Sequence, residues 1–398
     1  EGATIKNLTV AGSVATSSKF GASIAVENLP HVGYTNGTEI IDCYSSVNIT
    51  SSINGDGTNG GFVGMNHGRL IFTRCAFLGR MLGSTAECNG GFVGWNDVNG
   101  DLNFSQCVFD PVWVTMSETN SKTFSRYDNN NVPKFSNSEP SYFTYAGWGT
   151  DQGTQAVALT TAPANLGSKG ETHGKMTLYE NALLCGGKYY VTNLSLYDNA
   201  SNATLLRDTD GKQLNVTLSG RTLFKDGNWN TLCLPFDLSM DQFNNLLNGG
   251  KLIELDIEGT YDTDKKTGFD PTTGTLRLYF KDATEIKEIK AGTPYIIKWP
   301  SGTNLTDHKF QNVSIDNSDA TLIRQTVESA DGRVRFIGTF SPVELTIGDK
   351  SNLFLATNSE NKSTLNSPSG GNNGDTVNPK YFVNACRAYF HVDLSNTS

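Results

Sequence analysis

Three of the seven cysteines stand at a fixed spacing, since Cys43, Cys75 and Cys107 follow one another at intervals of 32 residues. Regularly spaced thiols could form a metal site or a redox centre. A reactive thiol needs an electropositive, partly exposed setting, whereas alternation along a strand would point these three side chains inward. Buried free cysteine packs as a small hydrophobe. We therefore predict a packing ladder, and expect no metal and no cofactor.

No other residue set completes a catalytic site. The five histidines lie far apart, and the chain has no HExxH, GxSxG, phosphate-loop or dinucleotide motif. Glycoside hydrolysis needs two positioned carboxylates, but the outward positions beside the cysteine ladder offer only Asp110. Two acidic loops (54–61 and 262–270) lack the carboxylates that calcium requires. We expect no enzyme. A polysaccharide hydrolase or lyase, or an accessory domain of one, is the alternative.

Charge and hydropathy exclude two classes of partner. The chain of 398 residues carries a net charge of −9, and its lysines and arginines are scattered rather than clustered, which argues against nucleic acid. No apolar run approaches the roughly 18 residues of a membrane-spanning helix. The opening "EGATIKNLTV" begins in mid-pattern, so we expect a fragment or a processed form.

The elements that would position the cysteines repeat along the chain. "NGGFVGMN" (59–66) and "NGGFVGWN" (89–96) alternate with the cysteine segments, and Leu8 stands where an earlier segment has no cysteine. A period of 30 to 35 residues with Gly and Asn corners is typical of stacked coils. We predict an all-β chain that begins with a short parallel β-solenoid (β-helix) of about four coils over residues 1–157. Leu8, Cys43, Cys75 and Cys107 would form one inward ladder. A β-meander or propeller blade is the rival interpretation.

One face of these coils could bind a ligand. If Phe62 and Phe92 point inward, Met65 and Trp95 point outward, because three residues along a strand reverse the face. An exposed Trp95 near Tyr44 could stack on a sugar ring. The alternative is that Trp95 packs beneath the second domain.

The second half changes pattern after a linker at 158–172. Nine or so short strand-like runs without a fixed period predict an antiparallel β-sandwich over residues 173–398. One helix is expected after Ser239, which can cap it together with Gln242.

Two resemblances cover most of the chain. The octets followed by "GRLIFTRCAF" and "GDLNFSQCVF" resemble the GLUG repeat of bacterial surface proteins, although the first copy, "GASIAVEN", lacks the double glycine. "SGRTLFKDGNWNTLCLPFDLS", "AGTPYIIKWP" and "CRAYFHVDL" resemble C-terminal domains of surface proteins in gut Bacteroidetes. The resemblance implies secretion and display at an extracellular, bacterial cell surface, commonly for adhesion. We therefore expect a non-catalytic, monomeric surface module that recognises a glycan or a protein.

Overall fold

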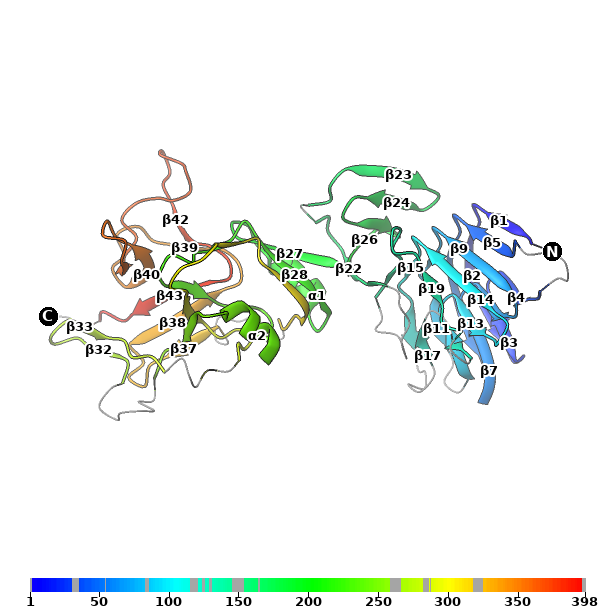
Figure 1. Ribbon diagram of the computed structural model, residues 1–398, viewed down its shortest axis with the longest axis horizontal. Helices are drawn as coiled ribbons and strands as arrows, with labels where there is room; N and C mark the ends of the chain where they lie inside the picture. Colours follow the sequence, from blue (N-terminus) through cyan, green and yellow to red (C-terminus); the bar gives the residue numbers. More distant parts are fainter. Residues whose placement is uncertain are drawn as a thin grey trace. The chain divides into compact units, whose positions relative to one another are not determined.

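The computed structural model divides the chain into two compact units, Glu1–Thr192 and Asn193–Ser398 (Figure 1). It is all-β, with 48% of residues in strands and 5% in helices. The structure describes residues 2–30, 36–53, 55–82, 86–114, 121–123, 126–128, 131–144, 154–163, 165–257, 266–281, 286, 288–317 and 325–395. Within these ranges no helix is both long enough and apolar enough to cross a membrane.

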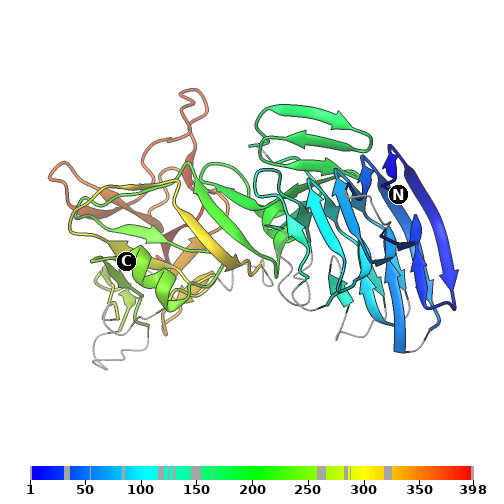
Figure 2. The ribbon, with the colours of Figure 1, turned by 45° about the vertical axis from the view of Figure 1, so that its right-hand side comes forward.

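The first unit is built on a β-solenoid of about three turns (Figure 2). Its strands stack in parallel, each on the equivalent strand of the next turn, in four sheets. The first sheet runs β1 (Thr4–Lys6), β5 (Thr38–Ile41), β9 (Arg69–Thr73), β14 (Asp101–Ser105), β19 (Lys134–Phe135). The second runs β16 (Val112–Val114), β11 (Arg80–Leu82), β6 (Tyr44–Ser51), β10 (Ala76–Phe77), β15 (Val108–Phe109), β20 (Tyr142–Phe143), β21 (Thr154–Gln155), with β2 (Thr9–Thr16) also on β6. The predicted parallel solenoid is thus confirmed, whereas the count of about four coils stays a prediction.

The two remaining solenoid sheets carry the glycine and asparagine repeats. The third sheet runs β17 (Ser121–Thr123), β12 (Ala86–Gly90), β7 (Gly55–Gly60), β3 (Phe20–Ala22). The fourth runs β18 (Arg126–Tyr127), β13 (Val93–Asn96), β8 (Val63–Asn66), β4 (Ala25–Asn28). Each repeated octet therefore supplies two strands and the bend between them, so it is a building block of the solenoid.

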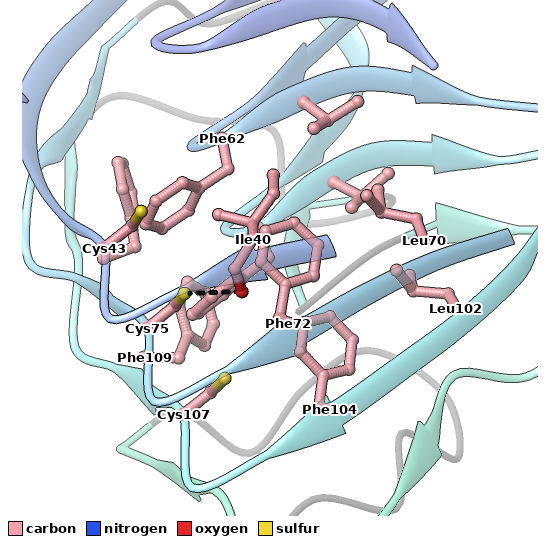
Figure 3. Packing of buried hydrophobic residues seen from close by; sticks show 14 of the residues in the cluster. Ile40, Cys43, Phe62, Leu70, Phe72, Cys75, Leu102, Phe104, Cys107 and Phe109 are labelled. Carbon is pink, nitrogen blue, oxygen red and sulfur yellow. Dashed lines mark hydrogen bonds between the residues drawn. The ribbon is translucent and has the colours of Figure 1, made fainter. Parts of the chain in front are cut away.

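Aromatic side chains fill the centre of the solenoid in columns (Figure 3). Phe62 stacks on Phe92, with ring centroids 5.0 Å apart. Phe72 stacks on Phe104 at 5.2 Å, and Phe104 on Phe135 at 5.3 Å. Equivalent residues of successive turns meet because the turns are in register, and offset aromatic pairs add to the free energy of burial. No single turn could bury this interior alone.

Each ladder position follows a corner in the left-handed backbone region. Asn7, Asp42, Arg74 and Gln106 have φ values of 56°, 55°, 51° and 53°. Asn and Asp tolerate this conformation, but Arg and Gln adopt it less readily. The tight corner turns the chain from the first sheet into the second at the same place in every turn.

Asparagine side chains form a second ladder, at the end of the fourth sheet. The Asn28 amide donates to Asn66 Oδ1 at 2.7 Å, and the Asn66 amide donates to Asn96 Oδ1 at 2.7 Å. Asn66 and Asn96 are fully buried. The sequence analysis placed these asparagines at corners, and the structure shows that their side chains bond across turns, which satisfies buried amides.

An antiparallel sheet covers the outer face of the second solenoid sheet. It runs β22 (Val157–Leu159), β26 (Lys188–Val191), β25 (Leu183–Cys185), β24 (Met176–Tyr179), β23 (Lys169–His173). Met176, Leu183 and Tyr190 pack against Ala76 and Val108 of the solenoid. The first unit therefore extends to Thr192. This differs from the expected linker at 158–172 and the expected domain start at 173, because these strands bury their apolar side chains on the solenoid.

In its described residues, the second unit consists of small sheets and two short helices. Its sheets are β27 (Asn193–Tyr197), β28 (Gln213–Ser219), β36 (Lys309–Ser314); β29 (Thr222–Leu223), β35 (Leu305–Thr306); β30 (Asn230–Leu232), β34 (Tyr295–Lys298), β31 (Lys251–Ile253); β32 (Gly268–Asp270), β33 (Thr275–Arg277); β37 (Thr326–Glu328), β38 (Val334–Thr339), β43 (Arg387–Val392), β40 (Asn352–Thr357), β41 (Ser363–Asn366); and β39 (Val343–Leu345), β42 (Tyr381–Val383). The helices are α1 (Ala203–Thr209) and α2 (Met240–Leu247). Ser239 and Gln242 form the expected capping box of α2. Of the strand pairs that the structure describes in this unit, all are antiparallel except β27–β28, and the sandwich architecture stays a prediction.

Candidate functional site

The cysteine ladder lies inside the solenoid (Figure 3). Cys43, Cys75 and Cys107 are at most 1% exposed and free of disulfides. Cys75 Sγ lies 3.2 Å from the carbonyl oxygen of Ile40, and burial raises the pKa of the Cys75 thiol well above its usual range. The hydrogen bond with Cys75 lowers the pKa of Cys43 to about 7, but Cys43 has no exposure through which to react. The described residues contain no group of three side chains that could hold a metal.

Leu8 continues this ladder in register but differs in burial. The amide of Tyr44 bonds to Leu8 O at 2.8 Å, as the amides of Ala76 and Val108 bond to Cys43 O and Cys75 O. Leu8 is nevertheless 39% exposed, contrary to the expectation that all four residues are buried. The reason is that Leu8 belongs to the first turn, where the described strands stack on one side only.

The three residues proposed as a binding face are not a shared exposed surface. Met65 is only 7% exposed, although it lies outside the central cluster, so its predicted exposure is wrong. Trp95 pairs with Met65 on the neighbouring strand and is partly buried. Tyr44 packs against the cluster formed between the solenoid and its covering sheet. Burial raises the pKa of Tyr44. Other parts of the protein therefore cover much of the surface of Met65, Trp95 and Tyr44 that was expected to contact a sugar.

A histidine–aspartate pair lies at a solenoid corner. His67 Nδ1 lies 2.5 Å from Asp97 Oδ2, and the two side chains are 23% and 11% exposed. In the sequence, His67 is one of five histidines that lie far apart. The pair joins the same corner of successive turns, as the asparagine ladder does beside it, so it supports the stacking of the turns.

An aromatic groove of about 330 Å³ lies in the second unit. Phe224 and Trp229 come from the connection between β29 and β30, Phe354 from β40 and Tyr381 from β42. Phe354 and Tyr381 stack with ring centroids 4.4 Å apart. Phe224 is 49% exposed, and Trp229 is partly buried. Four aromatic rings from three segments therefore meet in one hollow.

Side-chain hydrogen bonds hold the backbone at three aromatic residues that line the groove. The Asn230 amide donates to Phe224 O and accepts from Phe224 N, both at 2.9 Å. The backbone N–H of Trp229 donates to Ser363 Oγ at 2.9 Å. Asn372 bonds both backbone groups of Phe382, beside Tyr381. These bonds fix the backbone of the lining residues, so the groove has its shape before a ligand binds.

Polar groups reach the groove at one end. Arg387 and Asn384 line it, and both bond to Asp198: Arg387 Nη2 lies 3.0 and 2.9 Å from its carboxylate oxygens, and Asn384 Nδ2 lies 2.9 Å from Oδ2. Burial raises the pKa of Tyr381 to about 12, which Arg387 partly opposes. Tyr381 is therefore a neutral phenol at neutral pH and can donate a hydrogen bond.

The chemistry of this groove is that of binding. Rigid aromatic rings provide apolar surface, while amides, a phenol and a guanidinium provide directional hydrogen bonds. Among the described residues that line the groove, Arg387 is the one charged residue and none is a carboxylate. The pair of carboxylates that glycoside hydrolysis uses is thus missing from this set of lining residues.

The sequence analysis did not identify this groove, although it quoted the stretches that contain Phe224, Trp229 and Arg387. The signal available was the aromatic and amide content of "FKDGNWN". Phe354 and Tyr381 come from strands that pair across long sequence separations, β40 with β43 and β42 with β39. Comparisons with known proteins add no further guide, since no protein-family model, no curated protein and no solved structure matches the chain.

Proposed function

We propose that this protein is a non-catalytic module that binds a glycan through the aromatic groove of its second unit. The observation that carries the proposal is the meeting of Phe224, Trp229, Phe354 and Tyr381 beside Asn and Arg side chains. The faces of sugar rings pack on aromatic rings, and hydroxyl groups bond to amides and guanidinium groups. A volume of about 330 Å³ suits one or two sugar rings. A protein ligand would need a much larger contact area, on the order of 800 Å² on each partner.

A carbohydrate-active enzyme is the alternative, and the lining of the groove disfavours it. Hydrolysis of a glycosidic bond requires a proton donor and a second carboxylate on either side of the bond. The charged group of this groove is Arg387, which can neither donate a proton at neutral pH nor act as a nucleophile. Binding without turnover is the function that these side chains support.

The setting proposed for this binding comes from the sequence. Display at an extracellular bacterial surface, in a GLUG-repeat protein, is proposed on the resemblance of the glycine octets and of the second-half stretches. The expected monomer, the count of about four coils and the sandwich architecture of the second unit are parts of the same proposal. In this setting, a rigid solenoid would act as a spacer and the second unit would contact the glycan.

A glycan array probed with the intact chain tests the function, followed by calorimetry on the glycans that bind. We expect dissociation constants on the order of micromolar to millimolar, because a small groove buries little surface. Phe224→Ala removes a ring that is 49% exposed and should weaken binding at least about fivefold without unfolding the protein. Met240→Ala, at 50% exposure outside the groove, is the matched control.

Three results would contradict the proposal. They are an array without any bound glycan, equal affinities for Phe224→Ala and the unaltered protein, and release of reducing sugar from a bound polysaccharide. The last result would favour the enzyme instead.

A further inference from the structure

A guanidinium group with spare hydrogen-bond donors lies in the aromatic groove. The side chain of Arg387 is 31% exposed, and its Nη2 atom makes both contacts with Asp198. Nε and Nη1 of Arg387 make no hydrogen bond among the residues that the structure describes. A guanidinium carries five N–H donors in a planar fork, so part of this fork is available to a ligand.

A second guanidinium lies directly behind the wall of the groove. Arg221 is 2% exposed; its Nη1 donates to Ala385 O at 3.1 Å and its Nη2 donates to the carbonyl oxygen of Thr231, a lining residue. Its Nε is buried with no hydrogen-bond partner among the described residues. Among the described residues, Arg221 bonds to carbonyl oxygens and to no carboxylate. Burial of a charge without an opposite charge bonded to it is unfavourable, so this arginine is an unusual component for a structural wall.

The local charges do not balance. The charge of Arg387 lowers the pKa of Arg221, and the carboxylate of Asp198 raises it by less. The nearby thiols of Cys233 and Cys386 are neutral, because burial raises the pKa of both, to about 11 for Cys386. Burial lowers the pKa of Arg221 to about 9, with Arg387 as the next cause, so Arg221 still carries its proton at neutral pH. Two positive charges thus face one negative charge.

A third cation lies beside the groove. Lys298 Nζ lies over the ring of Trp229, 4.4 Å from its centroid. Trp229 lines the groove, so this ammonium group adds a positive charge next to the groove. Lys298 is not itself a lining residue. Arg387, Arg221 and Lys298 thus lie in or next to the groove, while the nearby carboxylates are those of Asp198 and of Asp226, which accepts from the N–H of Asn228.

We propose that this groove selects sugars that carry a negative charge, a carboxylate or a sulfate, with the anion held by Arg387 and the ring held on the aromatic side chains. The proposal rests on the glycan-binding function and adds the charge of the ligand to it. An anion would complete the local charge balance, and the planar fork of Arg387 matches the oxygens of either group. Neutral sugars would leave the excess positive charge unpaired.

The test uses the intact protein and glycans in matched pairs. An array carries neutral glycans next to the same glycans bearing a uronate, a sialate or a sulfate, and calorimetry follows on pairs such as lactose, 3′-sialyllactose and 3′-sulfolactose. We expect the charged member to bind about tenfold or more tightly, since charged hydrogen bonds are stronger than neutral ones. We also expect added salt to weaken its binding. Preference for carboxylate over sulfate, or the reverse, identifies which anion is recognised.

The outcomes separate the two proposals. Binding of charged and neutral glycans with equal affinity would overturn the charge selectivity and leave the glycan function standing. Absence of any glycan binding would overturn both. A preference for the neutral member of each pair would also overturn the selectivity.

Two substitutions assign the selectivity to the groove. Arg387→Gln should remove most of the preference, lowering affinity for the charged glycan about tenfold while changing the neutral one less than about threefold. Arg277→Gln, an exposed arginine on β33 outside the groove, removes the same charge and should change neither. Asp198→Asn keeps Arg387 and removes the carboxylate that bonds to it. This variant should bind the charged glycan more tightly, and its affinity should fall more steeply with added salt. An unchanged preference in either variant, measured on folded protein, would overturn the proposal, so one variant that folds is enough for the test.

Discussion

Asp42 and Arg74 occupy the same left-handed corner in successive turns of the solenoid, and their side chains bond to each other twice. Arg74 Nε lies 2.6 Å from Asp42 Oδ1, and Nη2 lies 3.2 Å from Oδ2. The φ values are 55° for Asp42 and 51° for Arg74. Arginine rarely adopts this conformation, so the ion pair offsets part of a strain that the register of the turns imposes.

This relationship predicts an order of stability for substitutions at position 74. Arg74→Ala loses the ion pair and keeps the strained backbone, whereas Arg74→Gly loses the same pair and relieves the strain. We expect Arg74→Ala to be the less stable of the two by roughly 1 kcal/mol, close to the difference between glycine and other residues in this region. Urea unfolding of both variants measures it. Equal stabilities would show that the corner is not strained.

The repeated double glycines are explained by close approach. A Cβ atom on Gly61 would lie 1.8 Å from Gly91 O, and a Cβ atom on Gly91 would lie 1.5 Å from Cε2 of Phe109. We therefore expect Gly61→Ala and Gly91→Ala to destabilise the first unit by about 1–3 kcal/mol through overpacking. Thermal unfolding gives the shift. Gly370→Ala is the control, because nothing lies within 4 Å of its added Cβ.

Much of the solenoid could be predicted from the sequence because stacking repeats its pattern. The spacing of Cys43, Cys75 and Cys107 reports the length of a turn, and alternation of small and apolar residues reports which face is buried. Burial of the outer face could not be predicted in the same way. Tyr44 is covered by the β22–β26 sheet, and nothing local in the sequence states where that sheet packs.

The candidate site was less accessible to sequence reasoning for the same physical reason. Residue type and spacing suggested Trp95, because an aromatic residue at an outward position of a repeat can be recognised from the sequence alone. Phe224 and Tyr381 lie far apart in sequence and meet only through the pairing of long-range strands in the second unit. Strand propensity is a property of one segment of the sequence, whereas a groove forms only where several segments come together.

A buried tyrosine makes the first unit sensitive to alkaline pH. Tyr190 OH donates to Asp110 Oδ2 at 2.9 Å, and burial, followed by the charge of Asp110, raises the pKa of Tyr190. A folded-state pKa above the unfolded value means that the folded state holds its proton more tightly. The resulting stability is fully present below the unfolded pKa of about 10 and is lost as pH rises above it.

Tyr190→Phe should therefore flatten the loss of stability between about pH 9 and pH 11. At neutral pH the variant should be less stable by roughly 1 kcal/mol, because a partly buried hydrogen bond is lost. Urea unfolding at a series of pH values measures both effects. Tyr189→Phe on the same strand is the matched control, and an identical pH profile for Tyr190→Phe and the unaltered protein would refute the assignment.

Trp95 and Phe224 provide a comparison between the two units. Trp95 lies beside Met65 on the neighbouring strand and is partly buried, so Trp95→Ala should uncover apolar surface and destabilise the solenoid by roughly 2–4 kcal/mol. Glycan affinity should be unchanged, because the proposed groove lies in the second unit. Phe224→Ala should do the reverse, with lower affinity and nearly unchanged unfolding. Calorimetric titration measures the glycan affinity of each variant, and thermal unfolding measures the stability of each. Loss of glycan affinity in Trp95→Ala, at a temperature where the variant is fully folded, would place binding on the solenoid. Trp95 would then be a sugar-binding residue, as its position in the repeat first suggested.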